Sequence, residues 1–368
     1  MTSSKEHMAQ ALALSKLGRF STKPNPMVGC VIVKNDQIIG EGWHIKAGEN
    51  HAEVNAIRDV YKRHTNNAQD LLKGSEVFVT LEPCNKIGRT PPCTLALIEA
   101  GVGKVFISQR DVSQSGVQDL LEAGIEIELG LLAEEAFEIN KSFFKRLESG
   151  KPFTTCKIAS SLDGGIALNN GDSKWITSKR SREEVHVMRA SSDAIITGVG
   201  TVLSDNPRLN ARLKNEELKK ICEQPLKCIV DSQGKMSGQE KILSEDPTII
   251  FCNDLDKSFK KDSVEFIKMP GENNKISLSG AVNLLGERGI NSLMIEAGPK
   301  LIDGMLEESL IDEFVIFIAP KILGTGKLNF SKLEGSLRNI GTIELDIQEV
   351  EVFGDDLKVS LTPNYLNL

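Results

Sequence analysis

Segments with strand character alternate with segments of helical character along the whole chain, and this alternation constrains the fold more than any other feature. Apolar, β-branched runs such as Val28–Val33 and Val77–Leu81 are typical of buried strands, and longer stretches such as Leu131–Leu147 are typical of helices. The pattern predicts α/β architecture, in which helices cover the faces of a sheet.

The remaining elements are expected in the same alternating order. In the first half we expect helices at Lys5–Leu17, near His51, at Cys93–Ala100 and Val117–Ala123, and strands at Gln37–Trp43, Val105–Ser108 and Ile125–Leu129. In the second half we expect strands at Phe153–Ile158, Ala194–Gly198, Lys227–Asp231, Thr248–Cys252, Ser292–Ile295, Glu313–Ala319, Leu345–Phe353 and Leu357–Leu361. Helices are expected there at Ser178–Ala190, Ser277–Arg288 and Pro299–Glu308, and residues 211–224 and 253–275 as loop-rich segments.

One short segment interrupts the alternation. A chain of 368 residues suggests two domains at about 150 residues each. Glu148-Ser-Gly-Lys-Pro152 is polar and contains helix breakers, so we place the boundary there. The sequence therefore predicts domains at residues 1–148 and 149–368.

Composition excludes several classes of protein. Lys and Arg number 44 against 51 Asp and Glu, a net charge of −7, and only two Trp and two Tyr are present, which argues against a nucleic-acid binder. The sequence contains no run of 18 apolar residues, so we expect no membrane-spanning helix. Its polar start does not resemble a signal peptide. Seven scattered cysteines fit a reducing compartment, so we expect a cytoplasmic enzyme.

The strongest local signal is His51-Ala-Glu53, followed by Pro83-Cys84 and Cys93. Zinc deaminases use a His-x-Glu and Pro-Cys-x-x-Cys pattern. One imidazole and two thiolates leave the fourth position of a tetrahedral zinc open for water, whose pKa the metal lowers. A carboxylate two residues from the histidine can then transfer protons during loss of ammonia. We expect zinc ligands at His51, Cys84 and Cys93, with Glu53 as the catalytic acid–base group.

The spacing departs from the general deaminase pattern, because eight residues instead of two separate Cys84 from Cys93. A structural zinc site and two ordinary buried thiols therefore remain alternatives. Three ligands with a glutamate nearby favour an open catalytic site.

The long form, Leu81-Glu-Pro-Cys-Asn-Lys-Ile-Gly-Arg-Thr-Pro-Pro-Cys93, resembles the bifunctional riboflavin-biosynthesis deaminase–reductase family. Further matching stretches follow in the family's order: Lys23-Pro-Asn-Pro-Met-Val-Gly-Cys30, Gly48-Glu-Asn-His-Ala-Glu53, Ala159-Ser-Ser-Leu-Asp-Gly164, Gly171-Asp-Ser-Lys-Trp-Ile-Thr177, Thr201-Val-Leu-Ser-Asp-Asn-Pro207, Ile295-Glu-Ala-Gly-Pro299 and Ala319-Pro-Lys-Ile-Leu-Gly324. The resemblance implies a cytidine-deaminase-like three-layer domain followed by a dihydrofolate-reductase-like α/β domain.

The resemblance also implies two consecutive reactions. The first is zinc-dependent hydrolytic deamination of 2,5-diamino-6-(5-phosphoribosylamino)pyrimidin-4-one. The second is reduction of the ribosyl side chain by NADPH, giving 5-amino-6-(5-phosphoribitylamino)uracil. Reductases of this kind are often dimers, so a homo-oligomer (dimer or tetramer) is expected.

By the same resemblance, residues of the second half divide into two groups. Substrate contacts are expected at Ser173, Arg189, Leu209, Arg212 and Glu296. NADPH contacts are expected at Ala159, Trp175, Thr201, Asp205, Ser232, Gly298, Pro299, Lys300, Leu301, Ile302, Asp303 and Gly304. Gly298-Pro299 has an independent rationale, since it follows an expected strand and opens an expected helix whose free N–H groups can bind a pyrophosphate. The residues alone do not distinguish NADPH from NADH.

Two stretches on the substrate side of the deaminase depart from the family pattern. Asn85-Lys86-Ile87 stands where a serine and a histidine are usual, and that histidine is expected to touch substrate. The loop Arg110–Gly116 is shorter than the family's proline- and glycine-rich loop. Three hypotheses follow: an enzyme with both sites active, a reductase with an impaired deaminase domain kept as a scaffold, and a nucleic-acid base editor or binding module.

Overall fold

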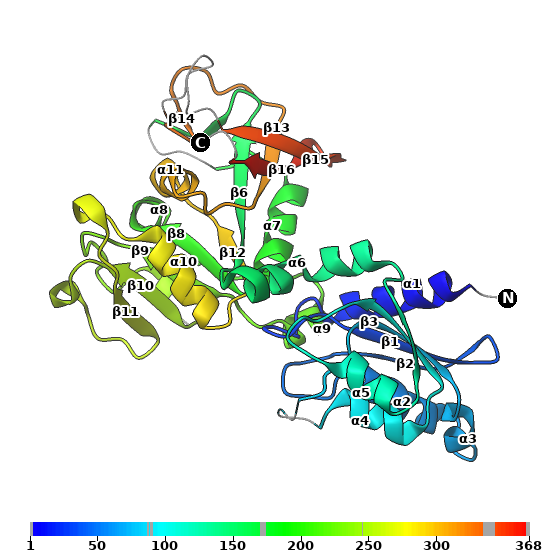
Figure 1. Cartoon of the computed structure of the whole chain (residues 1–368). Coiled ribbons are helices and arrows are strands. Elements are labelled where there is room, and N and C mark those ends of the chain that lie inside the picture. The colour runs from blue at the N-terminus through cyan, green and yellow to red at the C-terminus, as the bar shows by residue number, and fades with distance from the viewer. Residues whose placement is uncertain are drawn as a thin grey trace. The chain divides into compact units, whose positions relative to one another are not determined.

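The chain divides into two compact units, Met1–Leu147 and Glu148–Leu368, in a computed structural model (Figure 1). The structure describes residues 3–86, 88, 91–169, 174–244, 246–333 and 343–365. None of the helices in this described part combines the length and the apolar composition that a membrane span requires.

The first unit is built on a five-stranded sheet in the order β2-β1-β3-β4-β5. Its strands are β1 (Gly29–Lys34), β2 (Gln37–Trp43), β3 (Glu76–Leu81), β4 (Lys104–Gln109) and β5 (Glu126–Leu129). β1 pairs antiparallel with both β2 and β3, whereas β3, β4 and β5 are parallel. Asn35 and Asp36 form the β1–β2 turn with positive φ angles of 51° and 61°, which these residues tolerate better than most.

Helices cover both faces of this sheet and give three layers. One face packs against α1 and α6 through residues such as Met8 and Ala136, and the other against α2 to α5 through residues such as Val60 and Leu97. The helices are α1 (Ser4–Ser15, followed by the 3₁₀ turn η1, Lys16–Gly18), α2 (Ala52–Arg63), α3 (Ala68–Leu72), α4 (Cys93–Ala100), α5 (Gly116–Glu122) and α6 (Ala133–Ser149).

The second unit contains a nine-stranded sheet in the order β11-β10-β9-β8-β12-β6-β13-β16-β15. From β11 to β13 all neighbours are parallel, and β16 and β15 add an antiparallel hairpin at one edge. The strands are β6 (Phe153–Ser161), β8 (Ala194–Gly198), β9 (Leu226–Val230), β10 (Thr248–Cys252), β11 (Val264–Lys268), β12 (Ser292–Ile295), β13 (Glu313–Ala319), β15 (Glu344–Phe353) and β16 (Asp356–Asn364). A separate small sheet pairs β7 (Gly165–Leu168) with β14 (Lys327–Asn329).

Helices again lie on both faces of the larger sheet. α10 and α11 pack on one face through Leu285 and Met305, and α7 and α8 pack on the other through Val185 and Val202. The helices are α7 (Lys179–Ser191), α8 (Val199–Asp205), α9 (Glu216–Ile221), α10 (Leu278–Glu287) and α11 (Pro299–Glu307), with 3₁₀ turns η2 (Lys241–Leu243), η3 (Leu255–Lys257) and η4 (Glu272–Asn274). Both units therefore have the predicted α/β architecture.

Side-chain caps explain where several helices begin. Ser178 accepts a hydrogen bond from the Ser181 backbone N–H at the start of α7, and Ser277 accepts one from Gly280 at the start of α10. Such caps pair N–H groups that have no partner inside the helix. α11 instead begins with Pro299 directly after Gly298, as the sequence predicted.

The segments expected to be loop-rich contain regular structure. α9 lies within residues 211–224, and β11 lies within residues 253–275 as the edge strand of the larger sheet. β11 is a short segment of partly buried and exposed residues, with Glu265 and Lys268 exposed, so its strand pattern is weak. Its pairing with the buried β10 stabilises a conformation that its own sequence favours only slightly.

Candidate active sites

Three elements of the first unit bring the predicted zinc ligands together. His51 is the N-cap residue of α2, so this helix begins where the sequence predicted one, near His51. Cys84 lies in the loop that follows β3, and Cys93 is the first residue of α4. The site is therefore formed by two helix N-termini and the carboxyl end of a parallel strand, a common place for functional groups in α/β folds.

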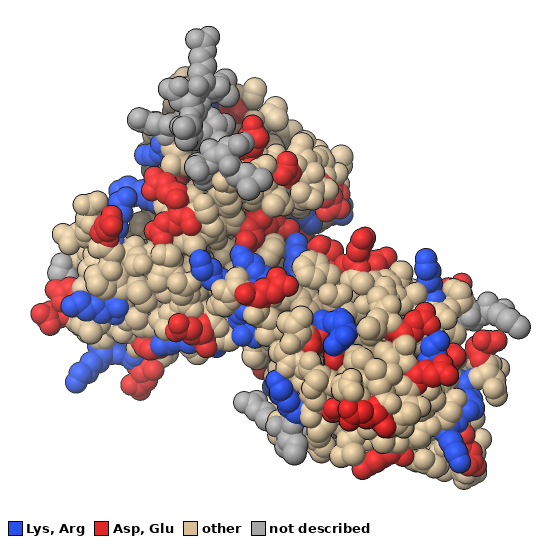
Figure 2. Space-filling model, in the orientation of Figure 1, with Lys and Arg blue, Asp and Glu red and all other residues tan. Residues whose placement is uncertain are grey.

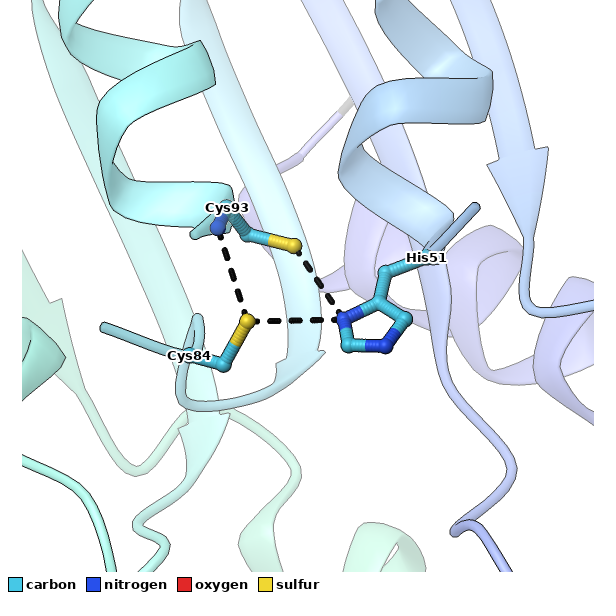
Figure 3. A group of neighbouring side chains, drawn as sticks. All are labelled: His51, Cys84 and Cys93. Atoms are coloured by element: carbon cyan, nitrogen blue, oxygen red, sulfur yellow. Dashed lines mark hydrogen bonds between the residues drawn. The ribbon is translucent and has the colours of Figure 1, made fainter. Parts of the chain in front are cut away.

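The three ligand atoms lie within 4.8 Å of one another (Figure 3). His51 Nδ1 is 3.5 Å from Cys84 Sγ and 3.3 Å from Cys93 Sγ. Ligands bound to one tetrahedral zinc through nitrogen and sulfur lie about 3.5 Å apart. Two sulfurs and one nitrogen at these separations fit zinc and leave its fourth position for a non-protein ligand.

The electrostatics of the thiols also fit a metal site. A hydrogen bond with Cys93, together with His51, lowers the pKa of Cys84 to about 4. The contact with Cys84 and burial raise the pKa of Cys93. Because a thiolate is the form that binds metal, Cys84 is the thiol that ionises first here.

Glu53 lies in the first turn of α2, two residues after His51, and is only 3% exposed. Burial raises the pKa of its carboxyl group above the ordinary value, and His51 opposes that shift. A buried carboxyl next to a metal site can exchange a proton with a bound ligand. The structure thus places Glu53 beside the three zinc-ligand candidates.

A cavity of about 450 Å³ opens beside His51 and Cys84. Its volume lies in the range of small-molecule sites. The other lining residues are Pro24, Asn25, Ala47, Gly48, Glu49, Lys86, Gly88 and Gln114. Lys86 thus reaches the cavity wall, whereas Ile87 lies outside the described residues.

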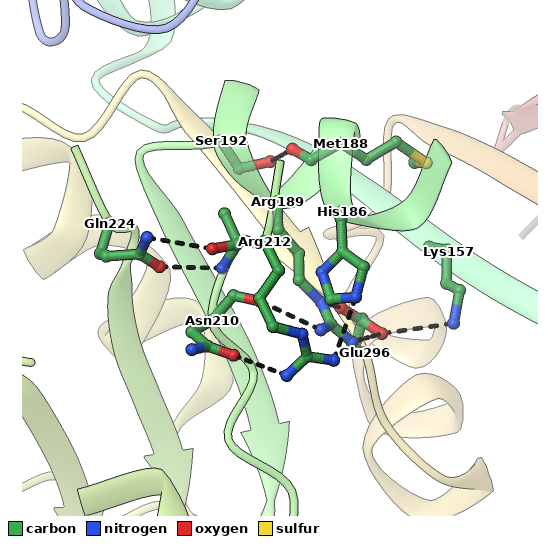
Figure 4. A network of polar contacts seen from close by, with 10 residues as sticks. Lys157, His186, Met188, Arg189, Ser192, Asn210, Arg212, Gln224 and Glu296 are labelled. Atoms are coloured by element: carbon green, nitrogen blue, oxygen red, sulfur yellow. Dashed lines mark hydrogen bonds and ion pairs between the residues drawn. The ribbon is translucent and has the colours of Figure 1, made fainter. Parts of the chain in front are cut away.

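In the second unit, Glu296 is the centre of a buried ionic network (Figure 4). Its carboxylate accepts hydrogen bonds from Arg189 Nε at 2.5 Å and from Arg189 Nη2 at 2.9 Å, and Lys157 Nζ lies 3.2 Å away. Despite the burial penalty, the two cations lower the pKa of Glu296 to about 2. Two of the expected substrate contacts, Arg189 and Glu296, are therefore a direct ion pair.

Arg212 belongs to the same network but has a different environment. Its guanidinium donates to Asn210 Oδ1 at 2.9 Å and contacts His186 Nε2 at 3.0 Å. Burial, with the charges of Arg189 and Arg212, lowers the pKa of His186 to about 4, so its Nε2 is free to accept from the arginine at neutral pH. Within the described residues Arg212 is exposed and has no carboxylate partner.

The expected NADPH contacts come from several elements of the second unit. The Gly298 N–H donates to Thr201 Oγ1 at 3.1 Å, which joins the start of α11 to α8. Trp175 is 65% exposed with the Arg182 guanidinium 4.3 Å from its ring centre. The other positions are Ala159 in β6, Asp205 at the end of α8, Ser232 after β9, and Pro299, Lys300, Leu301, Ile302, Asp303 and Gly304 in α11.

Three expected positions carry less information about a ligand. Leu209 is buried with a positive φ of 48° in the segment before Arg212. Ser173 lies outside the described residues. Asp303 already accepts hydrogen bonds from Ser331 Oγ and the Lys332 N–H.

Sequence reasoning assigned no role to three residues that the structure places at these sites. His186 precedes Arg189 by three positions on α7, so helical spacing is a signal that it shares a face with the arginine. Glu82 stands inside the Leu81–Cys84 motif and is buried. Gln114 lies in the loop Arg110–Gly116, which departs from the family pattern, but no signal distinguishes Gln114 from the other residues of this loop.

Charged side chains are mixed over the face of the molecule drawn in Figure 2, where Lys and Arg are interspersed with Asp and Glu. This face shows no continuous basic surface of the kind that binds a phosphate backbone.

Two family models match the chain. Residues 1–109 match the cytidine and deoxycytidylate deaminase zinc-binding region, and residues 152–359 match the RibD C-terminal domain. The riboflavin biosynthesis protein RibD of Haemophilus influenzae is 40% identical, over 97% of this chain and 96% of the relative. RibD of Escherichia coli is 38% identical, over 96% of this chain and 98% of the relative.

Solved structures agree with these matches. Acinetobacter baumannii RibD, form 2, superposes with a TM-score of 0.87 at 34% identity, covering 98% of each chain. The diaminohydroxyphosphoribosylaminopyrimidine deaminase/5-amino-6-(5-phosphoribosylamino)uracil reductase of Thermotoga maritima gives 0.86 at 34% identity, again over 98% of each chain. The chain therefore belongs to the RibD family of riboflavin biosynthesis proteins, which join a zinc-binding deaminase domain to a reductase domain.

Proposed function

We propose that residues 1–148 deaminate 2,5-diamino-6-(5-phosphoribosylamino)pyrimidin-4-one and that residues 149–368 reduce the ribosyl side chain of the product with NADPH. The product of both steps is 5-amino-6-(5-phosphoribitylamino)uracil. The observation that supports this most strongly is the His51, Cys84 and Cys93 cluster, which lies at a ligand-sized cavity with Glu53 beside it.

In the deaminase, His51, Cys84 and Cys93 would hold one zinc ion. When bound, zinc supplies a Lewis acid that activates water for attack on the carbon bearing the exocyclic amine. Glu53 takes a proton at its carboxylate and delivers it to the departing amine, for which its position in the first turn of α2 suits it. Its burial keeps bulk water away from that proton transfer.

In the reductase, the two arginines have separate roles. Both carboxylate oxygens of Glu296 already engage Arg189, so the charge of this arginine is largely compensated within the protein. Arg212 is held by two neutral acceptors, Asn210 and His186, and retains its positive charge for a ligand. Arg212 is therefore the residue that binds the substrate's phosphate, while Arg189 and Glu296 order the site around the ribosyl chain.

NADPH, when bound, supplies the hydride for the second step. The segment from Gly298 to Gly304, which begins α11, and Thr201 on α8 would hold its phosphates, since helix N-termini favour anions. Ala159, Trp175, Asp205 and Ser232 complete the contacts, together with Ser173 and Leu209 on the substrate side.

An assay with each substrate given separately, on protein of measured zinc content, tests this proposal. The enzyme with both sites active releases ammonia from the diamino substrate and oxidises NADPH with the deaminated intermediate. A reductase with a scaffold-like deaminase domain acts only on the intermediate. Protein that contains zinc but releases no ammonia would contradict the deaminase half.

The proposal also includes that this enzyme forms a homo-oligomer and acts in the cytoplasm. β15 is the outer strand of the larger sheet, and Ile347, Val350 and Val352 on it are 68%, 57% and 75% exposed. Their partners on β16 are alternate residues, so the three apolar side chains share one face. An exposed apolar edge strand of this kind is typical of a surface that a second copy covers.

A further inference from the structure

Two loops meet at the cavity of the deaminase, and the side chain of Glu82 joins them. This fully buried carboxylate accepts from Arg110 Nε at 2.6 Å and from the backbone N–H groups of Asp111 at 3.3 Å and Val117 at 3.0 Å. Glu82 lies two residues before Cys84. The loop between β4 and α5 is therefore fixed to the segment that carries a zinc-ligand candidate.

Asn85 and Lys86 add a second set of contacts between the same loops. Asn85 Nδ2 donates to Ser115 Oγ at 2.8 Å, and the Ser115 N–H donates back to Asn85 Oδ1 at 3.4 Å. Lys86 Nζ donates to the Ser113 carbonyl at 2.5 Å. The two stretches that depart from the family pattern thus contact each other directly.

These contacts present one residue, Gln114, to the cavity. Its backbone N–H donates to the Asp111 carbonyl at 3.0 Å, which closes a tight turn at the loop. Gln114 lines the cavity together with His51 and Cys84. Its Oε1 atom is buried and has no hydrogen-bond partner among the described residues. Buried polar atoms are nearly always paired, so an unpaired acceptor at a cavity wall indicates a ligand that donates.

We propose that Gln114 is a substrate-recognition residue of the deaminase, whose side-chain oxygen accepts a hydrogen bond from an amino group or ring N–H of the pyrimidine. This inference rests on the proposed function. A diamino-pyrimidinone carries such donors on its ring, and a neutral amide pairs with them without adding charge beside the zinc ligands. Asn85 and Lys86 act as positioning residues, because their hydrogen bonds to Ser115 and Ser113 hold the loop.

The Gln114→Met variant tests this role, since methionine has a similar length and no acceptor oxygen. We expect the KM for ammonia release to rise about tenfold, because a neutral substrate hydrogen bond is lost. Zinc content and NADPH oxidation with the deaminated intermediate should stay at wild-type values. Gln114→Glu keeps an acceptor oxygen, and its KM should lie closer to that of the wild type than to that of the methionine variant.

Gln118→Met is the matched control, because Gln118 is exposed on α5 and donates only to Glu122. It should leave the KM unchanged. A wild-type KM in Gln114→Met overturns the inference, and a Gln114→Glu variant as impaired as the methionine variant overturns the acceptor role. Absence of ammonia release from the unmodified enzyme is a different result, because it contradicts the proposed deaminase activity itself.

Discussion

Arg189 and Glu296 form a two-pronged ion pair, with Nε 2.5 Å from Oε1 and Nη2 2.9 Å from Oε2. The two residues are far apart in the sequence, on α7 and directly after β12, and both side chains are buried. Lys157 from β6 brings a second cation to the same carboxylate. The pair therefore links three elements of the larger sheet and its helix layer.

Glu296→Gln should strongly destabilise the second unit. It leaves the Arg189 and Lys157 cations, whose side chains are only 13% and 16% exposed, without a counter-charge, and breaking a buried pair in this way typically costs about 3–5 kcal/mol. Urea denaturation at pH 7 measures the loss. Glu265→Gln is the control, because its ion pair with Arg288 is exposed and worth about 1 kcal/mol or less. Equal losses of stability in the two variants would show that burial does not make the Glu296 ion pair stronger than the exposed one.

The Glu296 carboxyl group should also make the stability of the folded protein depend on pH in the acidic range. Its pKa is lowered to about 2 in the folded protein, from an ordinary value of 4.5. Its contribution is therefore complete above about pH 4.5 and is lost as the pH falls towards 2. The wild type should lose more stability than Glu296→Gln over this interval in urea titrations. If stability fell equally with pH in the wild type and in Glu296→Gln, the result would contradict the lowered pKa of Glu296.

His186 should make the stability of the fold depend on pH in a higher range than Glu296 does. Its pKa is lowered from 6.5 to about 4, so the unfolded chain binds a proton between these values while the folded protein does not. Stability therefore falls as the pH decreases from about 6.5 to 4. His186→Gln keeps an acceptor for Arg212 and removes the titration, so its urea midpoint should change less between pH 7 and pH 5. The same variant should retain most of the wild-type affinity for the phosphorylated intermediate.

Glu53→Gln should reduce ammonia release by about 10²–10⁴-fold, the usual contribution of a general acid–base group. Zinc content and reduction of the deaminated intermediate should be unaffected, because the zinc ligands and the second unit are unchanged. Glu99→Gln, at an exposed position of α4, is the control and should keep full activity. Deamination that survives in Glu53→Gln would refute the assigned role.

Gly116→Ala should weaken zinc binding without touching a zinc ligand. A Cβ atom at Gly116 would lie 1.9 Å from the Pro83 carbonyl oxygen, so the backbone next to Cys84 must shift. A competition titration with a zinc chelator measures the effect. Gly326→Ala, where a Cβ atom has open space, should behave like the wild type. Unchanged zinc affinity in Gly116→Ala would show that the loop adapts.

Replacing Ile347 and Val352 together by Asp should shift the protein towards monomer in sedimentation experiments. Charges on this face of β15 resist burial against a second copy. Because both residues are exposed, thermal stability of the monomer should change little. A wild-type sedimentation coefficient in the double variant would exclude this face as the contact.

The parts predicted well from the sequence have local signals. Strands such as Thr248–Cys252 and Ser292–Ile295 are continuous apolar runs, which buried parallel strands require. The His51, Cys84 and Cys93 cluster was found because metal chemistry restricts both residue type and order. The start of α11 was predicted because Gly298-Pro299 follows a strand.

The parts that were missed depend on contacts between distant segments. Nothing near Glu296 in the sequence indicates that Arg189 lies against it, or that Lys157 completes the network. Gln114 becomes informative only when Glu82 and Asn85 fix its loop, which places Gln114 at the cavity. β11 was missed because a short edge strand in a charged segment differs little from a loop until β10 is beside it.

The junction between the two loops of the deaminase also constrains how this protein can evolve. Pro83 touches Gly116, and Asn85 and Lys86 bond to Ser115 and Ser113, so neither segment can change length or composition alone. An insertion after Asp111 would leave the Asn85 and Lys86 side chains without their partners. We therefore expect these two segments to be inherited as a pair, and transplanting one into a relative should succeed only when the other is transplanted with it.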